Sequence, residues 1–255
     1  MRRRFFVDHF ESDSATLRGE TAEHLGRVLR AEPGQLYELS DGHRVWLSRV
    51  ERVALSKRGE NRIEFALIEP IPAREPALEI ELLISLVKFD RFEWCLEKAT
   101  ELGAAEIIPL AAARTDKPLI AATAKRRARW EKILVESAQQ SRRLRPPILH
   151  VGPGGSAVTP EQAFARSTAT CKILLSERRA AVPIREVFPA TNETDSARGI
   201  QSAALAIGSE GGWTDGEIAA AHANGFAEAS LGENVLRTET AVLAAMAILS
   251  FAVGR

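Results

Sequence analysis

The sequence predicts an α/β protein in which a small N-terminal β-barrel precedes a larger domain built on a largely parallel sheet. Three features of the 255-residue chain support this prediction: short β-like runs before about residue 70, prolines clustered at 69–76, and strand–helix alternation after them. Alternating strands and helices are typical of a parallel sheet covered by helices. Because proline-rich stretches often separate domains, we expect one domain at 1–72 and another at 73–255.

The N-terminal part is expected to form a compact antiparallel barrel. Its strand-like runs lie at 36–39, 44–50 and 62–68. Residues 40–42 (Ser-Asp-Gly) are a turn signal between the first two runs. The barrel therefore depends on hairpin connections between strands that are close in sequence.

The C-terminal part is expected to alternate between strands and helices. Strands are expected at 80–87, 107–110, 171–175, 203–207 and 227–231, and helices at 89–102, 122–143, 214–225 and 239–251. Thr214 and Glu217 have the spacing of a capping box, which marks a helix start. Gly103 is well placed to end the helix before it. Residues 191–201 are expected to form a poorly ordered loop.

The composition is typical of a globular chain without a membrane segment. The net charge is zero, and no apolar run reaches the ~18 residues of a membrane span. Cys95 and Cys171 stand alone, without ligand spacing, which suits the reducing cytoplasm. Neither a P-loop nor a metal-like spacing of histidines occurs. We therefore expect a cytoplasmic protein with no metal and no membrane partner.

The basic residues are concentrated in one part of the chain. Between Arg114 and Arg145 there are ten basic and three acidic residues, a local excess of +7 (10 − 3). Clustered cations of this kind are the electrostatic footprint of phosphate binding. A solvated helix face is the other interpretation, and the sequence leaves both open.

Two glycine-containing loops near the C-terminus are the clearest functional signal. Residues 207–214 read IGSEGGWT, and residues 231–241 read LGENVLRTETA. Each loop follows a strand-like run, and glycine lets a backbone turn tightly and approach a ligand closely. The first loop alone also fits a tight turn before a capped helix. The two loops together predict one ligand cleft between neighbouring strands.

These loops resemble those of the SPOUT class of S-adenosylmethionine-dependent RNA methyltransferases and, within it, the RsmE family. The family's first loop usually reads G-P-E-G-G, and its second L-G-x-R-I-L-R-T-E-T-A. Here Ser209 replaces the proline, while Asn234 and Val235 stand where arginine and isoleucine are common. The further segments that resemble the family are 4–7 (RFFV), 24–25 (HL) with 28–30 (VLR), 88–103 (KFDRFEWCLEKATELG) and 138–142 (AQQSR).

The resemblance implies an S-adenosylmethionine-dependent 16S ribosomal RNA (uracil-N3)-methyltransferase. It further implies that residues 1–72 form a PUA-like RNA-binding barrel and that residues 73–255 form a SPOUT domain with a C-terminal trefoil knot. The expected partners are 16S ribosomal RNA, or the assembled small ribosomal subunit, and a second copy of the chain. A homodimer is expected because the class dimerises through the knotted domain.

The resemblance also assigns residues to the expected sites. The cofactor-binding residues are Leu175, Ser176, Glu177, Gly208, Glu210, Gly211, Gly212, Leu231, Gly232, Val235, Leu236 and Thr240. The family segments and the basic stretch supply the RNA-binding residues Arg4, Arg30, Lys88, Arg91, Arg126, Arg127 and Arg142.

Arg237 and Glu239 are the expected catalytic residues because they adjoin the cofactor loops. N3 of uracil becomes nucleophilic when its proton leaves, and general acid–base help is typically worth ~10²–10⁴-fold. The permanent charge of Arg237 makes it a poor base and a good stabiliser of the uracil anion. Glu239 is the acid–base alternative, or else the group that orients Arg237.

Two other functions remain possible from the sequence. One is a non-catalytic RNA-binding protein that keeps the fold, although the glycines of both loops are retained here. The other is a SPOUT methyltransferase that acts on transfer RNA or on a ribose 2′-hydroxyl. The N-terminal barrel and the segment at 88–103 argue against a transfer RNA or ribose 2′-hydroxyl substrate.

Overall fold

The structure, a computed structural model, describes residues 3–56, 60–188 and 200–253. Most of the expected loop at 191–201 lies outside the described residues. The chain divides into two compact units. The first unit comprises Met1–Glu75 together with Ala138–Pro146, and the second comprises Pro76–Ser137 together with Pro147–Arg255. No helix in the described part of the chain combines the length and apolar character that a bilayer crossing requires.

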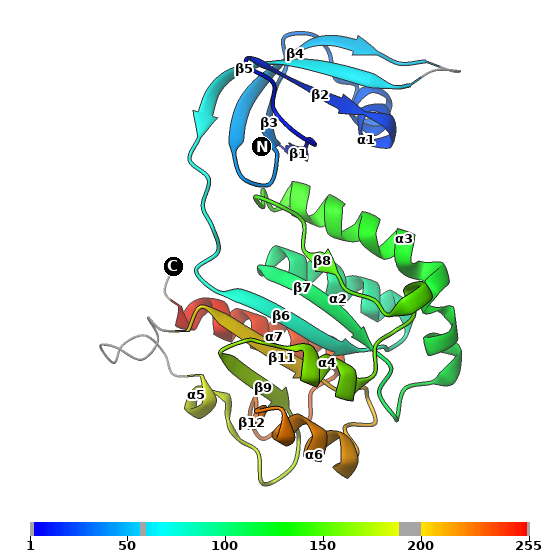
Figure 1. Cartoon of the computed structure of the whole chain (residues 1–255), viewed down its shortest axis with the longest axis vertical. Coiled ribbons are helices and arrows are strands. Elements are labelled where there is room, and N and C mark those ends of the chain that lie inside the picture. Colours follow the sequence, from blue (N-terminus) through cyan, green and yellow to red (C-terminus); the bar gives the residue numbers. More distant parts are fainter. Residues whose placement is uncertain (1–2, 57–59, 189–199, 254–255) are drawn as a thin grey trace. The chain divides into compact units, whose positions relative to one another are not determined.

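The first unit is built on a curled sheet of five strands (Figure 1). The strands are β1 (Arg4–Phe6), β2 (Ser14–Arg18), β3 (Leu36–Ser40), β4 (Val45–Ala54) and β5 (Arg62–Ile71), in the order β1-β3-β4-β5-β2. Neighbours are antiparallel except β1, which pairs in parallel with β3. The expected strands are therefore present, and β1 and β2 are two strands that the sequence analysis did not predict.

The core of the first unit lies between this sheet and a short helical segment. Helix α1 (Gly19–Glu23) continues into a π-helical turn, η1 (His24–Val28), and Leu25 of that turn is fully buried. The ring of Tyr37 meets those of Phe5 and Phe65 edge-on, with centroids 5.7 and 6.5 Å apart. Burial of large apolar side chains is the main stabilising term for such a small core.

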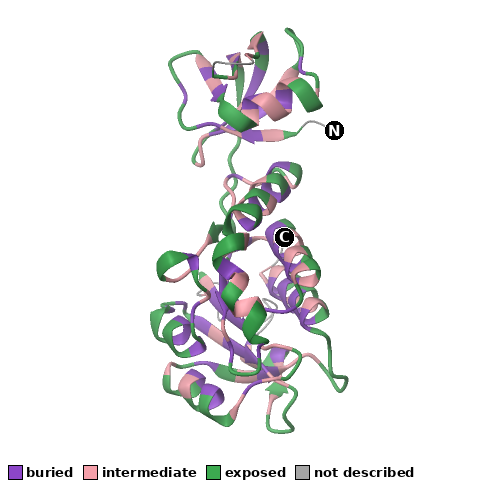
Figure 2. Cartoon of the chain, turned by 90° about the vertical axis from the view of Figure 1, so that its right-hand side faces the viewer, coloured by how far each residue is buried: buried purple, intermediate pink, exposed green. Residues whose placement is uncertain are grey.

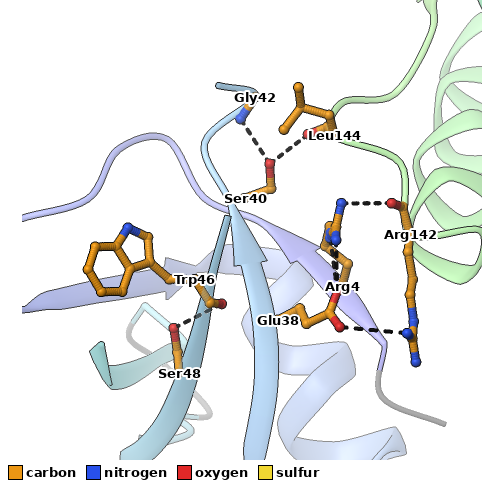
Figure 3. A network of polar contacts seen from close by, with 8 residues as sticks. All are labelled: Arg4, Glu38, Ser40, Gly42, Trp46, Ser48, Arg142 and Leu144. Carbon is orange, nitrogen blue, oxygen red and sulfur yellow. Dashed lines mark hydrogen bonds and ion pairs between the residues drawn. The ribbon is translucent and has the colours of Figure 1, made fainter. Parts of the chain in front are cut away.

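A segment from far along the chain completes the first unit, as Figure 3 shows. The Ser40 hydroxyl donates to the carbonyl of Leu144 at 2.6 Å. Arg4 donates through Nε and Nη2 to one carboxylate oxygen of Glu38, at 3.1 and 2.8 Å, and through Nη1 to the carbonyl of Arg142 at 2.7 Å. Residues 138–146 are thereby held against β1 and β3.

The second unit is built on a seven-stranded sheet in which all neighbouring strands are parallel. Its strands are β6 (Glu79–Ser85), β7 (Ala104–Leu110), β8 (Ile148–Leu149), β9 (Cys171–Leu175), β10 (Val182–Pro183), β11 (Ser202–Ile207) and β12 (Ala227–Ser230). Their order is β10-β12-β9-β11-β6-β7-β8. This confirms the predicted parallel sheet.

Helices cover both faces of that sheet. They are α2 (Phe89–Glu101), α3 (Lys117–Gln140), α4 (Pro160–Arg166), α5 (Ile184–Val187), α6 (Asp215–Ala223) and α7 (Thr238–Ala252), with a 3₁₀ turn, η2, at Pro153–Gly155. Successive strand residues alternate between the faces. Leu82 packs with α2, α3 and α7, whereas Leu83 packs with α4 and α6. The central strands are accordingly mostly buried in Figure 2.

The helix ends show which sequence signals were informative. Thr214 and Glu217 form the expected capping box at the start of α6, and Gly103 takes the left-handed φ of +98° after α2. Helix α3 begins at Lys117 and ends at Gln140, earlier than expected at both ends. The break follows from Arg142, whose φ of +54° is incompatible with a continuing helix.

Candidate functional site

A cleft of about 450 Å³ opens where β9, β11 and β12 end at the carboxyl edge of the sheet. Ligands of open parallel sheets characteristically bind beyond this edge. Most of the lining comes from the ends of these strands and the residues that follow them, within 175–179, 207–213 and 229–236. The two glycine loops expected from the sequence therefore meet around one cavity.

Nine of the twelve expected cofactor-binding residues line the cleft. They are Leu175, Ser176, Glu177, Gly208, Gly212, Leu231, Gly232, Val235 and Leu236. Glu210, Gly211 and Thr240 are outside the lining. Arg114, Arg178, Arg179, Trp213, Ile218, Thr238 and Ala241 line the cleft although the sequence did not single them out as cofactor contacts.

The first glycine loop is confined by its neighbours. A Cβ at Gly208 would lie 3.2 Å from the ring of Trp213, and one at Gly211 would lie 3.0 Å from Cβ of Arg114. Gly212 has a φ of +70°, and a Cβ there would lie 2.9 Å from Oε1 of Glu177. Larger residues would therefore be strained or would displace a wall of the cleft.

Trp213 connects this loop to the strand beside it. The indole is buried, and its Nε1 donates to the carbonyl of Leu175 at 2.9 Å. Buried indole N–H groups normally need such a partner. The end of β9 is thus held against the loop that follows β11.

The second loop approaches the cleft with its backbone. Gly232 lines the cavity with a φ of +141°, and a Cβ there would meet no atom of the described residues within 4 Å. Val235 is 74% exposed and Leu236 is 37% exposed, which leaves apolar surface beside the cavity. This wall combines backbone polar groups with apolar side chains, as small-molecule sites commonly do.

The start of α7 joins the two loops. Thr238 is buried, and its Oγ1 donates to the carbonyl of Gly208 at 3.1 Å. Arg237 is the residue before the helix, and its side chain is exposed, with no ion pair or hydrogen bond among the described residues. Arg237 does not line the cavity, but both its neighbours Leu236 and Thr238 do.

Glu239, in the first turn of α7, faces helix α2. Its Oε1 is 3.7 Å from Nε of Arg91 on α2, and its Oε2 is buried without a hydrogen-bond partner within the described ranges. Arg91 also forms a close ion pair with Glu210 of the first glycine loop. The structure therefore brings both catalytic candidates to the start of α7, with Glu239 facing α2.

Arg114 and Glu217 are site residues that sequence reasoning missed. Nη1 of Arg114 donates to the carbonyl of Gly211 at 2.7 Å, and the side chain lines the cleft. Glu217 is buried and accepts from the backbone N–H of Ala113 at 2.8 Å. The capping box was a signal for Glu217, but nothing in the sequence linked it to residue 113.

The expected RNA-binding residues are distributed over both units. In the first unit, Arg4 and Arg142 contact each other and share Glu38, while Arg30 is exposed with a φ of +52°. The second unit holds the other four: Lys88 is exposed before α2, Arg91 pairs with carboxylates, Arg126 pairs with Glu93, and Arg127 pairs with Glu131. Several of these cations therefore have acidic partners within the chain.

One polar atom in the cleft wall has no partner. Oγ of Ser209, the residue that replaces the family's proline, is buried and makes no hydrogen bond among the described residues. Burying a hydroxyl without a partner costs about 1–3 kcal/mol.

Known proteins resemble this chain over most of its length. A family profile described as "RNA methyltransferase domain" matches residues 74–250. Ribosomal RNA small subunit methyltransferase E of Synechocystis sp. is 32% identical over 92% of this chain and 72% of its own length. The Bacillus subtilis protein of the same name is 29% identical over 94% of this chain and 91% of its own length.

Solved structures agree over nearly the whole chain. The crystal structure of ribosomal RNA small subunit methyltransferase E from Neisseria gonorrhoeae, bound to S-adenosyl methionine, superposes with a TM-score of 0.78 at 28% identity. The match covers 98% of this chain and 97% of that chain. Together with the profile match, these relatives show that the chain belongs to the RNA methyltransferase family of ribosomal RNA small subunit methyltransferase E.

Proposed function

We propose that the protein is an S-adenosylmethionine-dependent methyltransferase that methylates N3 of a uridine in 16S ribosomal RNA. The convergence of the two glycine loops on one cleft, next to Arg237 and Glu239, is the observation that carries this proposal. Membership in the ribosomal RNA small subunit methyltransferase E family supports the reaction and the substrate.

The cleft fits S-adenosylmethionine in its chemistry. Backbone at Gly208, Gly212 and Gly232 offers amides and carbonyls where side chains would fill the space. Leu175, Leu231 and other apolar side chains supply a surface for a planar base. A volume of about 450 Å³ lies in the usual range for sites of this size. When bound, S-adenosylmethionine supplies an electrophilic methyl group.

The residues at the start of α7 act on the uracil. The guanidinium of Arg237 is exposed beside the cleft and would stabilise the negative charge on O2 and O4 that appears as N3 loses its proton. Glu239 would accept that proton or hold Arg237 in place. Positioning of the base beside the cofactor supplies much of the remaining acceleration.

The RNA would contact cations of both units. The basic stretch offers Lys117 and Lys125, which are exposed and form no ion pair among the residues described. The arginines on α3 attract RNA phosphates less strongly than their number suggests, because Arg126, Arg127 and Arg129 each pair with a glutamate. Each phosphate contact adds a salt-dependent increment to affinity.

A homodimer is part of the proposal. Helix α7 presents an apolar stripe of Leu243, Ala247 and Phe251, spaced so that all three lie on one exposed face. Phe251 is 82% exposed and Leu243 is 39% exposed. A second copy of the chain would cover this stripe, and the reaction would take place in the cytoplasm, where ribosomal RNA is found.

Nucleoside analysis tests the proposed function directly. The purified protein would be incubated with S-adenosylmethionine and either 16S ribosomal RNA or assembled small subunits, and the RNA would be digested for mass spectrometry. We expect N3-methyluridine as the product. A 2′-O-methylated nucleoside, or methylation of transfer RNA instead, would assign a different substrate. Cofactor binding without any methyl transfer would indicate a non-catalytic protein.

A further inference from the structure

Arg91 occupies a position between two parts of the site that are far apart in sequence. It lies in the first turn of α2, and its side chain is 28% exposed. One side of the guanidinium forms a close ion pair with Glu210 of the first glycine loop. Its Nε is 3.7 Å from Oε1 of Glu239, in the first turn of α7. The side chain thus spans the cofactor loop and the candidate catalytic segment.

A second contact joins the same two segments. Oγ1 of Thr238 donates to the carbonyl of Gly208 at 3.1 Å, on the cleft side of the same loop. The first glycine loop is therefore tied to the start of α7 at two points, through Gly208 directly and through Glu210 by way of Arg91. A displacement of the loop would be transmitted to Arg237, which precedes Thr238 in the chain.

The surroundings of Glu239 make Arg91 its principal polar contact. Its side chain is 18% exposed, and its Oε2 has no hydrogen-bond partner in the described part of the chain. On α2, one turn after Arg91, the buried thiol of Cys95 has its pKa raised to about 12 by burial and by the negative charge of Glu239. A neutral thiol cannot compensate that carboxylate, whereas the guanidinium of Arg91 can.

We propose that Arg91 is a positioning residue that couples the first glycine loop, and with it the cofactor, to the placement of Arg237 and Glu239. This inference rests on the proposed function and refines it. The family resemblance of residues 88–103 suggested that Arg91 contacts RNA, and we assign it a positioning role instead. Its charge is already balanced by two carboxylates, so little attraction for a phosphate remains. Its planar guanidinium instead faces two carboxylates at once, with Nη1 at Glu210 and Nε at Glu239.

Replacement of Arg91 by alanine distinguishes a positioning role from a role in RNA binding. We expect Arg91→Ala to weaken S-adenosylmethionine binding, measured by calorimetry, by about tenfold. We also expect kcat with saturating RNA to fall on the order of 10²-fold, as for other misplacements of reacting groups. The slope of RNA affinity against salt concentration should stay as in the wild type. If Arg91 instead bound a phosphate, its removal would flatten that slope by roughly 0.7–0.9.

Three further variants sharpen the test. Arg91→Lys should restore only part of the cofactor affinity, and it decides the question if Arg91→Ala does not fold. Glu210→Gln combined with Arg91→Ala should lose no more cofactor affinity than the weaker-binding single variant, because both remove the same link. Lys98→Ala is the matched control on the same helix, since Lys98 pairs only with Glu97 and Glu101 among the described ion pairs.

The possible results distinguish a failure of this inference from a failure of the proposed function. Cofactor affinity and kcat of Arg91→Ala within twofold of the wild type would overturn the inference, as would a flattened salt slope with unchanged cofactor affinity. A wild-type protein that binds S-adenosylmethionine but leaves the RNA unmethylated would contradict the proposed function. The cofactor affinities of the variants would still decide whether Arg91 holds the loop.

Discussion

The Oε1 atom of Glu217 accepts a hydrogen bond from the backbone N–H of Ala113 at 2.8 Å, across 104 positions of sequence. The other carboxylate oxygen accepts from the backbone N–H and the hydroxyl of Thr214, both at 2.8 Å. One buried side chain therefore caps α6 and fixes the loop after β7. That loop carries Arg114, which holds the carbonyl of Gly211.

Removal of this carboxylate should destabilise the protein. We expect Glu217→Ala to lower the free energy of unfolding by about 2–4 kcal/mol, because it breaks three hydrogen bonds to a charged acceptor and removes the cap of α6. Urea denaturation would measure the loss. Asp215→Ala is the control in the same helical turn. Its side chain is 96% exposed and forms only a surface ion pair with Arg178 among the described ion pairs, so it should change stability by no more than about 1 kcal/mol.

Gly212 provides a test of the cofactor site. We expect Gly212→Val to abolish S-adenosylmethionine binding, because its φ of +70° disfavours a side chain and the new atoms would crowd Glu177 in the cleft wall. Gly225→Val is the matched control, since Gly225 has a φ of +82° but does not line the cleft. Unchanged affinity in a folded Gly212→Val protein would exclude this part of the site.

Arg237 should act on the chemical step rather than on cofactor binding. We expect Arg237→Ala to reduce methyl transfer on the order of 10²-fold or more at unchanged cofactor affinity, as for a contact made in the transition state. Arg237→Lys should recover part of the rate because it keeps the charge but loses the fork. Single-turnover assays with saturating RNA would measure this. Near-normal turnover in Arg237→Ala would direct attention to Glu239.

The RNA-binding role of α3 can be measured through salt dependence. We expect Arg126→Ala with Arg127→Ala to flatten the log–log salt slope of RNA affinity by roughly 0.7–0.9 for each phosphate that the variant no longer binds. Arg166→Ala on α4 removes a comparable arginine that pairs with Glu106, and it should leave the slope unchanged. An unaltered slope in the double variant would show that this face of α3 does not bind RNA.

Cys95 makes stability depend on pH under alkaline conditions. Burial, with the charge of Glu239, raises the pKa of the thiol from 9.0 to about 12. Between these values the unfolded chain loses the proton that the folded chain retains, so the stabilisation present below pH 9 is lost as pH rises. Between about pH 8 and about pH 10.5, the wild type should lose about 2 kcal/mol more than Cys95→Ala in urea denaturation. Equal losses would contradict the raised pKa.

Much of the fold was predictable because its signals are local. The apolar run that became β9 and the capping box of α6 depend on residues within a few positions of one another. Helix α4 was missed, although Thr159 and Gln162 form a capping box around Pro160. The end of α3 was misplaced because Arg142, which is not a glycine, takes the left-handed conformation that ends the helix, with the N–H of Arg143 donating to the carbonyl of Ala138 at 2.9 Å.

The site was predictable only as far as its motifs extended. The glycine loops identified most of the cleft wall. The position of Arg114 in that wall could not be predicted, because its loop is held by the carboxylate of Glu217, more than 100 residues away. Arg91 illustrates the same limit. Its segment resembled the family, but only the folded chain places it between Glu210 and Glu239. The threading of a trefoil knot stays a prediction from resemblance.

The discontinuous first unit has a consequence for biosynthesis. Ser40 and Leu144 are 104 positions apart, and Arg4 and Arg142 are 138 apart, yet both contacts belong to this unit. A nascent chain therefore cannot complete its N-terminal unit until translation has passed Pro146. During that interval Ser40 lacks its acceptor, and Glu38 lacks one of its two cationic partners. The residues first to emerge are thus among the later ones to reach their final contacts.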